Sequence, residues 1–244
     1  MKFPSPRFFA LCAAVVAVAA GPTQTSAADP DEQAGGVPAP VEQIPVVYPY
    51  DLATAGVEGN AVVQFNVDAK GYVGEVAVVN ASHPAFGFAA KGMIEAERFA
   101  PPVQDGKAVA RPGLKQEVRF TIASLNADTR ALLDELKKPQ PDITKARELD
   151  AVPPKLITAV NPVYPHSLLA AVGPAAKGGE AVVECIIDRQ GRVLLPRIIS
   201  ATTEDCGWAA ATALLRWKFE PPTKGGKAVA TRIQIPLEFI PPKT

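Results

Sequence analysis

The sequence predicts an α+β protein made of two tandem small domains, each built β-β-α-β with an antiparallel three-stranded sheet packed by a helix. Three observations carry this prediction. Residues 59–102 repeat without a gap at 179–222, 120 positions later; short segments alternate apolar and polar residues; and a helical apolar stripe follows in each copy. Self-similarity over most of a domain indicates duplication, so one fold is expected twice.

The repeat is visible at turn residues and at core residues alike. Glycines recur at Gly59 and Gly179 and at Gly71 and Gly191, and the phrase "GKAVA" occurs at 106–110 and again at 226–230. Further matched pairs are Val63/Val183, Asp68/Asp188, Gly87/Gly207, Phe99/Phe219 and Pro101/Pro221. Upstream, the Tyr-Pro pair at 48–49 recurs at 164–165, an offset of 116, so the second copy carries about four extra residues near "GPAAKGG".

Each copy opens with a predicted hairpin. In "AVVQFNV", residues 61–67, Val63, Phe65 and Val67 share one face of a half-buried strand. "DAKG" follows, with Asp68 beginning a tight turn and Gly71 closing it in a left-handed conformation. The second copy repeats the pattern as "AVVECII", "DRQG" and "RVLLPRIIS", residues 181–200.

A helix is predicted after each hairpin. Ser82 with Pro84 in the first copy, and Thr202 or Thr203 with two acidic residues in the second, are N-terminal signals. The buried stripe is expected at Phe86, Ala89, Ala90 and Met93, and at Cys206, Ala209, Ala210 and Ala213. The Pro-Pro pair is expected to stop the helix, after which "GKAVA" leads into a closing strand. "DLATAG" and "SLLAAV", ahead of the hairpins, could each add a short helix.

The remaining segments are expected to be processing and linking sequences. Lys2, Arg7 and the apolar run 8–21 are typical of a signal peptide over 1–27, and the run is shorter than the roughly 20 residues of a membrane span. An uncleaved anchor is the alternative. Residues 28–44 are predicted to be a disordered tether. The domains then cover 45–123 and 153–241, with a linker at 124–152 whose helix, Leu125 to Lys137, is expected to pack against the first copy.

The order of these motifs resembles the TonB C-terminal domain family. The order is Tyr-Pro, Gly-x-x-Val-Val, Asp-x-x-Gly, a helix, Phe-x-Pro-Pro, Gly-Lys-x-Val and an alternating last strand, over Pro45 to Ile122 and Pro154 to Ile240. The resemblance implies a periplasmic protein-binding domain whose last strand pairs with a segment of an outer-membrane TonB-dependent receptor, in energy-coupled nutrient or siderophore uptake. This chain departs from the family plan because it has two domains and no convincing anchor or long rigid spacer, so a soluble binding or adaptor protein is expected; an uncleaved anchor would restore the transducer role.

The expected binding chemistry is strand addition to an open sheet edge. The predicted edge residues are Lys115, Glu117, Val118, Arg119, Phe120, Thr121 and Ile122 in the first copy, and Ile233, Ile235 and Leu237 in the second. Pro236 removes one donor from the second edge, so the first copy is predicted to bind better. Expected partners are an outer-membrane TonB-dependent receptor, another envelope protein, or a second copy of the chain through the same edges. The alternative function is an envelope structural or scaffolding protein whose paired domains bind each other, peptidoglycan or another envelope protein, with no transport role.

Two cysteines replace aromatic core residues in the second copy. At the 120-residue offset Cys185 stands for Phe65 and Cys206 for Phe86, both at expected core positions. An oxidising compartment makes a disulfide between them the prediction, with two buried free thiols as the alternative.

No enzymatic chemistry is predicted. His83 and His166 occupy different places in the two copies and are interpreted as surface or capping residues, and Asp68 and Asp188 as turn residues. Trp208 and Trp217 are interpreted as packing residues. No nucleophile, phosphate loop or zinc pattern stands out, so no cofactor, metal or small-molecule substrate is expected. A formal net charge of +0 also gives no reason to expect nucleic acid as a partner.

Overall fold

The computed structural model describes residues 37–169 and 178–241. The predicted signal peptide and residues 28–36 of the predicted tether lie outside this part of the chain. In the first repeat the main elements are α2 (Tyr50–Ala55), β1 (Gly59–Val67), β2 (Val73–Ala81), α3 (Pro84–Ala96) and β5 (Arg111–Phe120). Their counterparts in the second repeat are α5 (His166–Leu169), β8 (Gly179–Ile187), β9 (Val193–Ala201), α6 (Glu204–Leu214) and β13 (Thr231–Phe239).

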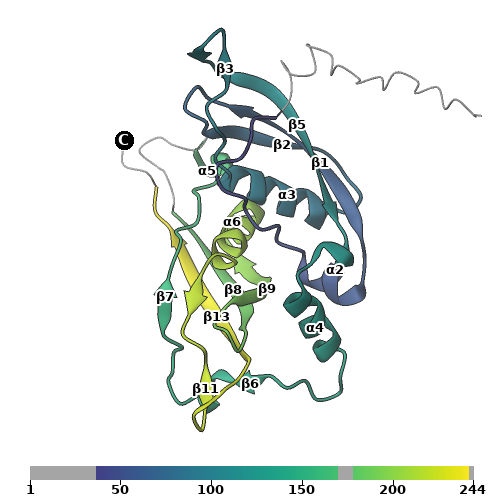
Figure 1. Ribbon diagram of the computed structural model, residues 1–244, viewed down its shortest axis with the longest axis vertical. Helices are drawn as coiled ribbons and strands as arrows, with labels where there is room; N and C mark the ends of the chain where they lie inside the picture. The colour runs from purple at the N-terminus through teal and green to yellow at the C-terminus, as the bar shows by residue number, and fades with distance from the viewer. Residues whose placement is uncertain (1–36, 170–177, 242–244) are drawn as a thin grey trace, which may run out of the picture. The chain divides into compact units, whose positions relative to one another are not determined.

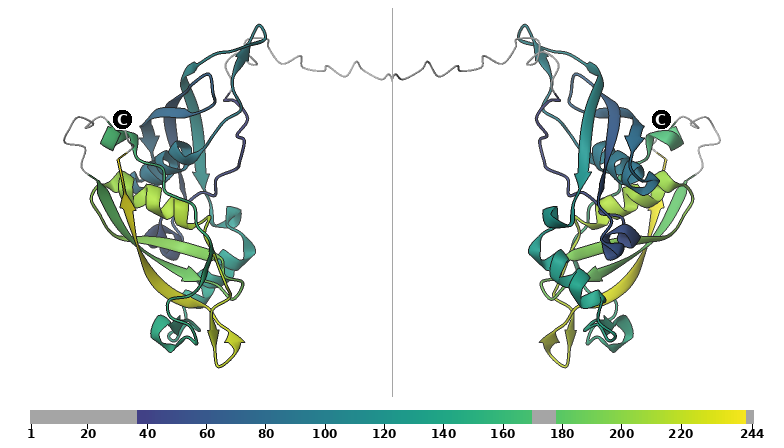
Figure 2. Two further views of the ribbon diagram at one scale, coloured as in Figure 1. Left: turned by 90° about the vertical axis from the view of Figure 1, so that its left-hand side faces the viewer. Right: turned by 90° about the vertical axis from the view of Figure 1, so that its right-hand side faces the viewer.

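Both repeats have the predicted β-β-α-β plan. The first sheet has the strand order β2-β1-β5, and the second has β6-β13-β8-β9. The three main strands of each sheet pair antiparallel, and β6 (Thr144–Lys145) joins the second sheet as a parallel partner of β13. In each repeat the helix lies against one face of its own sheet (Figure 1, Figure 2). The fold class predicted from the duplication is therefore confirmed.

The hairpin turns explain why each repeat needs its Asp-x-x-Gly motif. Asp68 Oδ1 accepts hydrogen bonds from the backbone N–H groups of Lys70 and Tyr72, at 2.8 and 2.9 Å. Gly71 has φ +87°, and an added Cβ would lie 1.9 Å from the carbonyl oxygen of Phe99, whose own N–H donates to Gly71 at 2.9 Å. The turn thus packs its backbone directly against the chain leaving the helix, an approach that glycine permits. Gly191 and Phe219 repeat the arrangement.

The first helix begins one residue later than its predicted signal, whereas the N-cap of the second is one of the two threonines predicted for it. His83 and Thr203 are the N-caps, accepting from the backbone N–H of Ala85 and Cys206, respectively. Ser82 instead bonds the backbone of Asn60 in the first strand. The predicted apolar stripes of both helices are buried as expected.

The helices end before the Pro-Pro pairs that were expected to stop them. α3 ends at Ala96, because Arg98 and Phe99 leave the helix to pair with the hairpin turn through Tyr72 and Gly71. The Pro-Pro pair then precedes a small hairpin, β3 (Val103–Gln104) and β4 (Lys107–Ala108), with Asp105 and Gly106 both at positive φ. The second repeat follows α6 with β10 (Lys218–Phe219), β11 (Thr223–Lys224) and β12 (Lys227–Ala228). The repeated "GKAVA" phrase therefore forms half of this hairpin and the entry to the closing strand.

Part of the predicted tether is an ordered element. The backbone N–H of Ala100 donates to Ala39 at 2.8 Å, the N–H of Val41 donates to Arg98 at 2.7 Å, and Ile44 is buried. In the second repeat β7 (Leu156–Thr158) holds the same position and pairs with β10. Residues 37–44 thus correct the disorder prediction, because backbone pairing that is not apparent in their composition holds them.

The linker helix contacts the first repeat, as predicted, and also the second. α4 (Ala127–Leu136) begins after the N-cap Asn126 and buries Leu132 and Leu133. It contacts α2 of the first repeat, but Asp128 also forms an ion pair with Arg192 of the second repeat at 2.7 Å. The short helix η1 (Ile122–Ser124) precedes α4, and β6 and η2 (Ala146–Glu148) follow it along the linker.

The two repeats meet through their helices. α3 packs against α6, where Gly92 lies against Trp208 closely enough that a Cβ would be 3.1 Å from the Cβ of the tryptophan. Lys91 Nζ lies 2.8 Å from Asp205 Oδ2, and His166 Nε2 lies 3.1 Å from the carbonyl oxygen of Val73. His166 thus contacts the other repeat, where a surface or capping role was expected. Trp208 packs between the repeats, as predicted.

Candidate functional site

The side chains of β5 alternate between the core and solvent. Leu114, Val118 and Phe120 are buried, whereas Lys115, Glu117 and Arg119 are exposed on the opposite face. Phe120 stacks on Phe86 of α3, with ring centroids 4.4 Å apart, so this strand is fastened to its helix by an aromatic pair. Of the predicted edge residues, Val118 and Phe120 therefore turn their side chains into the core and do not offer them to a guest.

Hydrogen-bond directions show which backbone groups of β5 face outward. The N–H of Ser82 donates to the carbonyl of Asn60, so the backbone of Asn60 points toward β2. Because successive residues of a strand point their backbone groups to opposite sides, Gly59 and Ala61 point toward β5, where they pair with Phe120 and Val118. The intervening residues of β5 must then direct their N–H and C=O groups away from the sheet. These residues are Lys115, Glu117 and Arg119.

The outer side of β5 has no strand partner in the described part of the chain, where β1 is its one neighbour. Its exposed side chains interact with one another: Glu117 accepts a hydrogen bond from Arg119 at 3.1 Å and one from Asn60 at 2.9 Å. These two hydrogen bonds hold the pKa of the Glu117 carboxyl below its usual range. The edge thus has three outward donors and three outward acceptors beneath a charged surface.

Two residues predicted for this edge lie beyond it. β5 ends at Phe120, and Thr121 caps the short helix η1, its hydroxyl accepting from the N–H of Ser124. Ile122 lies inside η1, and its N–H donates to Glu58 Oε1 at 2.7 Å. Both residues already use their backbone groups locally, so they are not open ladder positions.

The same reasoning assigns the outer side of β13. The N–H of Thr202 donates to the carbonyl of Glu180, so Glu180 faces β9 and its neighbours Gly179 and Ala181 face β13. The outward residues of β13 are therefore Gln234, Pro236 and Glu238. Pro236 has no N–H, so this edge has two outward donors where β5 has three.

The start of β13 is already paired. Thr231 and Arg232 lie opposite Thr144 and Lys145 of β6, in parallel. The N–H of Thr144 donates to the carbonyl of Ala230 at 2.8 Å, and the hydroxyl of Thr231 donates to the carbonyl of Thr144 at 2.9 Å. The linker thus covers the beginning of the second edge and leaves the rest open.

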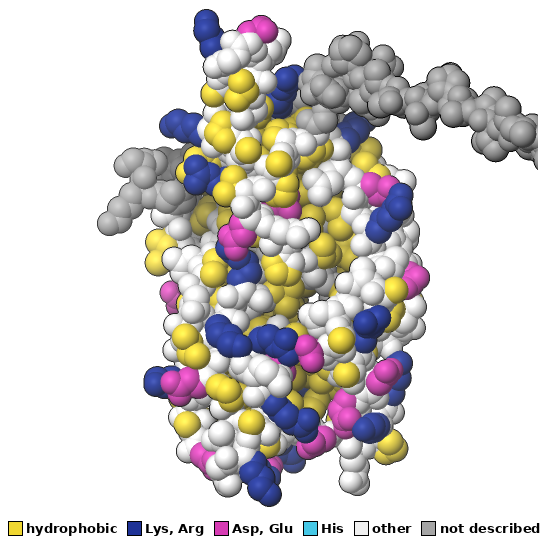
Figure 3. Space-filling view, in the orientation of Figure 1, with side chains coloured by type: hydrophobic (Ala, Val, Ile, Leu, Met, Phe, Trp, Pro, Cys, Tyr) yellow, Lys and Arg dark blue, Asp and Glu magenta, His cyan; other side chains and the backbone are white. Residues whose placement is uncertain are grey.

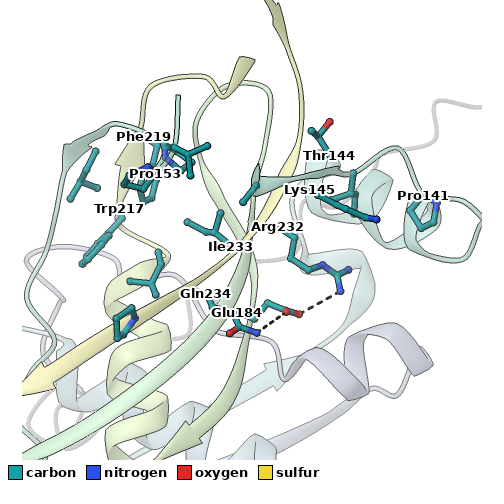
Figure 4. Close-up of a pocket in the computed structure, with 17 residues that line it drawn as sticks. Pro141, Thr144, Lys145, Pro153, Glu184, Trp217, Phe219, Arg232, Ile233 and Gln234 are labelled. Carbon is teal, nitrogen blue, oxygen red and sulfur yellow. Dashed lines mark hydrogen bonds and ion pairs between the residues drawn. The ribbon is translucent and has the colours of Figure 1, made fainter. Parts of the chain in front are cut away.

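An apolar groove of about 890 Å³ runs beside this open part. Trp217 and Phe219 form one wall, and the linker residues Val152, Pro153 and Pro154 extend it toward β7. Figure 4 shows Ile233 on the side of Trp217 and Phe219, whereas Arg232 and Gln234 point the other way, toward Glu184. Of the predicted residues, Ile233 and Ile235 line the groove, and Leu237 is buried in the core.

Sequence reasoning missed the linker's part in this groove. Ile143 and Thr144 form too short a segment for alternation to indicate a strand, and Trp217 was interpreted as packing alone. Its indole N–H does donate to the carbonyl of Val160 at 2.8 Å, a structural role, while its ring lines the groove. The presence of several prolines between 139 and 154 was the one available signal of an extended chain lying on a surface.

The predicted disulfide is not formed, and its geometry is wrong. Cys185 and Cys206 are both buried free thiols. A Cβ on Gly179 would lie 2.7 Å from the sulfur of Cys206, so this cysteine lies near the start of β8. Cys185 is six residues further along the same strand, about 20 Å away at 3.3 Å per residue, whereas a disulfide needs Cα atoms within about 7 Å. Both cysteines are in the core, as the offset indicated, but Cys206 packs beside one end of β8 and Cys185 lies toward the other.

The surface shows no large area of one charge on the face seen in Figure 3, where basic, acidic and apolar side chains are interspersed. Among residues 37–169 and 178–241, no cluster of His, Cys, Asp and Glu is arranged to hold a metal ion. Within the same ranges, no helix combines the length and apolar character required to cross a bilayer.

Comparisons with known proteins agree with the resemblance found in the sequence. The model of the family described as "Gram-negative bacterial TonB protein C-terminal" matches residues 44–122 and 160–241. No curated protein matches the chain. Two solved structures are similar. The solution structure of the Pseudomonas aeruginosa TonB C-terminal domain is 27% identical, with a TM-score of 0.31, over 36% of this chain and 88% of that one. The TonB2 protein of Vibrio anguillarum is 26% identical, with a TM-score of 0.30, over 51% and 99%. Because the family model matches both repeats and more than half of the residues, this chain belongs to the TonB C-terminal family, with two copies of the domain.

Proposed function

We propose that the protein is a periplasmic protein-binding module that pairs with extended segments of envelope proteins by strand addition. The observation that carries the proposal is the outer side of β5, where Lys115, Glu117 and Arg119 direct unpaired backbone groups away from the sheet. An extended guest satisfies these groups in the way a neighbouring strand does. Membership in the TonB C-terminal family supports an envelope protein as the guest.

The first partner class is the periplasmic segment of an outer-membrane TonB-dependent receptor. A three-residue outward ladder matches a short extended peptide, and the alternating charges of Lys115, Glu117 and Arg119 can interact with polar side chains of a guest. Binding requires no catalytic step, and we propose no enzymatic activity, cofactor or metal.

The test is a titration of isotope-labelled protein with a synthetic peptide from the N-terminal region of such a receptor. Amide resonances of Lys115, Glu117 and Arg119 are expected to shift or broaden first, and their amide protons to gain protection from exchange. The proposal fails if no peptide perturbs either closing strand at millimolar concentration.

A proline variant isolates the backbone contribution at β5. Glu117→Pro removes one outward N–H and leaves the backbone hydrogen bonds to β1 intact, because the neighbouring residues make those bonds. We expect guest affinity to fall by about threefold to tenfold, the equivalent of one hydrogen bond. Glu117→Ala is the matched control, since it removes the same carboxylate and keeps the N–H. Equal losses in the two variants would assign the effect to the side chain.

A scaffolding role is the second candidate, because the closing strands of both repeats, β5 and the end of β13, have an outer side without a strand partner among the described residues. Each edge can hold a different envelope protein, or a second copy of the chain. Retention on purified peptidoglycan in the absence of any receptor, or concentration-dependent dimerisation that Glu117→Pro abolishes, would favour this role over receptor binding.

A further inference from the structure

The inter-repeat linker builds a wall beside the open edge of β13. The stretch from Val152 to Pro154, with Leu156, faces the strand across the groove, and Trp217 and Phe219 lie between them. Leu156 and Val152 remain 42% and 61% exposed, an unusual state for large apolar side chains beside an apolar cavity. The groove is therefore an apolar surface next to free backbone groups.

The linker is fastened in this position by several polar contacts. The carboxylate of Asp150 accepts from the backbone N–H groups of Gly225 and Gly226, at 2.8 and 2.9 Å, and these two bonds help hold its pKa low. Glu148 pairs with Lys224 at 2.7 Å. The wall is consequently a built part of the second repeat and contacts the β11–β12 turn on one side.

The backbone on the other side of the groove sets where a guest can pair. Gln234 has an outward N–H and C=O, Pro236 an outward C=O, and Arg232 already faces β6. β6 blocks the ladder at its start, so an added strand must begin at about Gln234. The guest is thereby restricted to a short extended segment.

The charges beside the ladder favour an acidic guest residue. Lys145 lies opposite Arg232 in the parallel ladder, so both side chains are on the face away from Trp217. Arg232 pairs with Glu184 at 3.4 Å, and Lys145 makes no ion pair with a described residue. Lys145 adds a positive charge at the blocked end, where Glu148, the described carboxylate that interacts with it electrostatically, already pairs with Lys224.

We infer that this linker-built groove is a second, selective site for a short extended peptide of a partner protein, with a bulky apolar side chain beside Trp217 and an acidic one beside Lys145. The inference rests on strand addition as the proposed function, and it names the partner's chemistry. Apolar and acidic side chains are required at successive positions, because the two walls lie on opposite faces of the added strand.

The probe is the fluorescein-labelled peptide acetyl-Val-Glu-Trp-Thr-Val-Gly-amide, measured by fluorescence anisotropy against the full chain. Two altered peptides, with Glu replaced by Lys and Trp replaced by Ala, are expected to bind at least about fivefold more weakly. Amide resonances of Gln234 and Glu238 are expected to respond, and those of Lys115 and Arg119 to respond less.

Matched variants of the protein test each wall. Lys145→Glu is expected to weaken the Glu peptide by about fivefold and to strengthen the Lys peptide, with Lys107→Glu, an exposed residue of β4, as the control. Leu156→Asp is expected to weaken binding by about fivefold or more, whereas Ile157→Asp, its exposed neighbour outside the groove, should leave affinity within about twofold.

The outcomes separate this inference from the proposed function. If receptor peptide binds at β5 while the groove variants leave every affinity unchanged, the groove is not a site and the proposed function survives. If no peptide perturbs either strand, both fail. Stronger probe binding after removal of residues 1–36 or 242–244 would identify the chain's own termini as the occupant. Binding that competes with self-association would identify a second copy. Each of these last two results overturns a partner protein as the guest.

Discussion

The closing strands β5 and β13 come from the same duplicated unit, yet they present different edges. β5 has three outward donors, a charged face and no described strand on its outer side. β13 has two outward donors, a linker strand over its first residues and an apolar groove along the rest. If the proposed strand addition holds, one fold provides a long edge for recognition through the backbone and a short edge for recognition through side chains as well. Duplication followed by local change separates the two.

Substitutions of the turn glycines that both repeats share should have the largest effect on stability. Gly71→Ala and Gly191→Ala place a Cβ 1.9 Å from a carbonyl oxygen, at φ +87° and +77°. Each variant is expected to lose about 2 kcal/mol or more of unfolding free energy, measured by urea denaturation. Gly74→Ala, whose Cβ would be 3.7 Å from its nearest neighbour, is the control. A small effect at one of the two turns would break the structural equivalence of the repeats.

The second largest effect is expected in the pH dependence of stability, which should differ between the two repeats. Burial raises the pKa of Glu95 to about 7, opposed by Lys91, and burial likewise raises the pKa of Glu97 to about 7. The folded protein then binds more protons than the unfolded chain between about pH 4.5 and 7, so its stability falls as pH rises through this window. The second repeat has Leu215 and Trp217 at these positions.

Removing one buried carboxyl should flatten this dependence. Glu95→Gln is expected to eliminate on the order of 2 kcal/mol of the decrease in unfolding free energy between pH 5 and 8. Urea denaturation at both pH values measures it, and Glu75→Gln, an exposed carboxyl of β2, should keep the wild-type slope. An unchanged slope in Glu95→Gln would assign the pH dependence to another group.

Restoring a donor to β13 sharpens the contrast between the edges. Pro236→Gln supplies an outward N–H, and it is expected to strengthen peptide binding at the groove by about threefold, measured by anisotropy. Glu238→Pro removes the next outward donor and should weaken binding by a similar factor. If Pro236→Gln has no effect while Glu238→Pro does, the guest does not pair at the position of Pro236.

Reducing agent should have no effect on stability. In a Cys12→Ser chain, thermal unfolding with and without dithiothreitol is expected to coincide. Cys185 lies toward the end of β8, whereas Cys206 lies in α6 beside the start of that strand, so the two thiols are too far apart to bond. Titration of the unfolded, unreduced protein should find two thiols. Burial raises the pKa of Cys185 to about 12, so this thiol should react slowly while the protein is folded. If the unfolded protein shows the two thiols only after a reductant is added, the disulfide does form and this prediction is wrong.

Several elements could be predicted from sequence because their signals are local. The alternation of Val63, Phe65 and Val67 indicated a half-buried strand, and all three are buried. The stripe from Phe86 to Met93 indicated a helix with one buried face, which α3 has. In both cases the spacing of a few neighbouring residues determines which side of the element is apolar. Burial of that side is the dominant favourable contribution to the free energy of folding.

Elements that depend on distant partners escaped prediction. The residues 39–41 look like a tether until they pair with Arg98 and Ala100, and Thr144 becomes a strand because Ala230 lies beside it. The cysteines illustrate the same limit: an offset shows that two positions are in the core, but not that they are at opposite ends of it.

The amino-acid sequence by itself determined the duplicated β-β-α-β plan, the core faces and the turn glycines, because periodicity and backbone sterics act over a few residues. The tertiary structure decided which edge stays open, where the linker lies and how far apart the two thiols are. Those features depend on contacts between residues up to about a hundred positions apart, whose pairing is settled by competition among all surfaces of the folded chain.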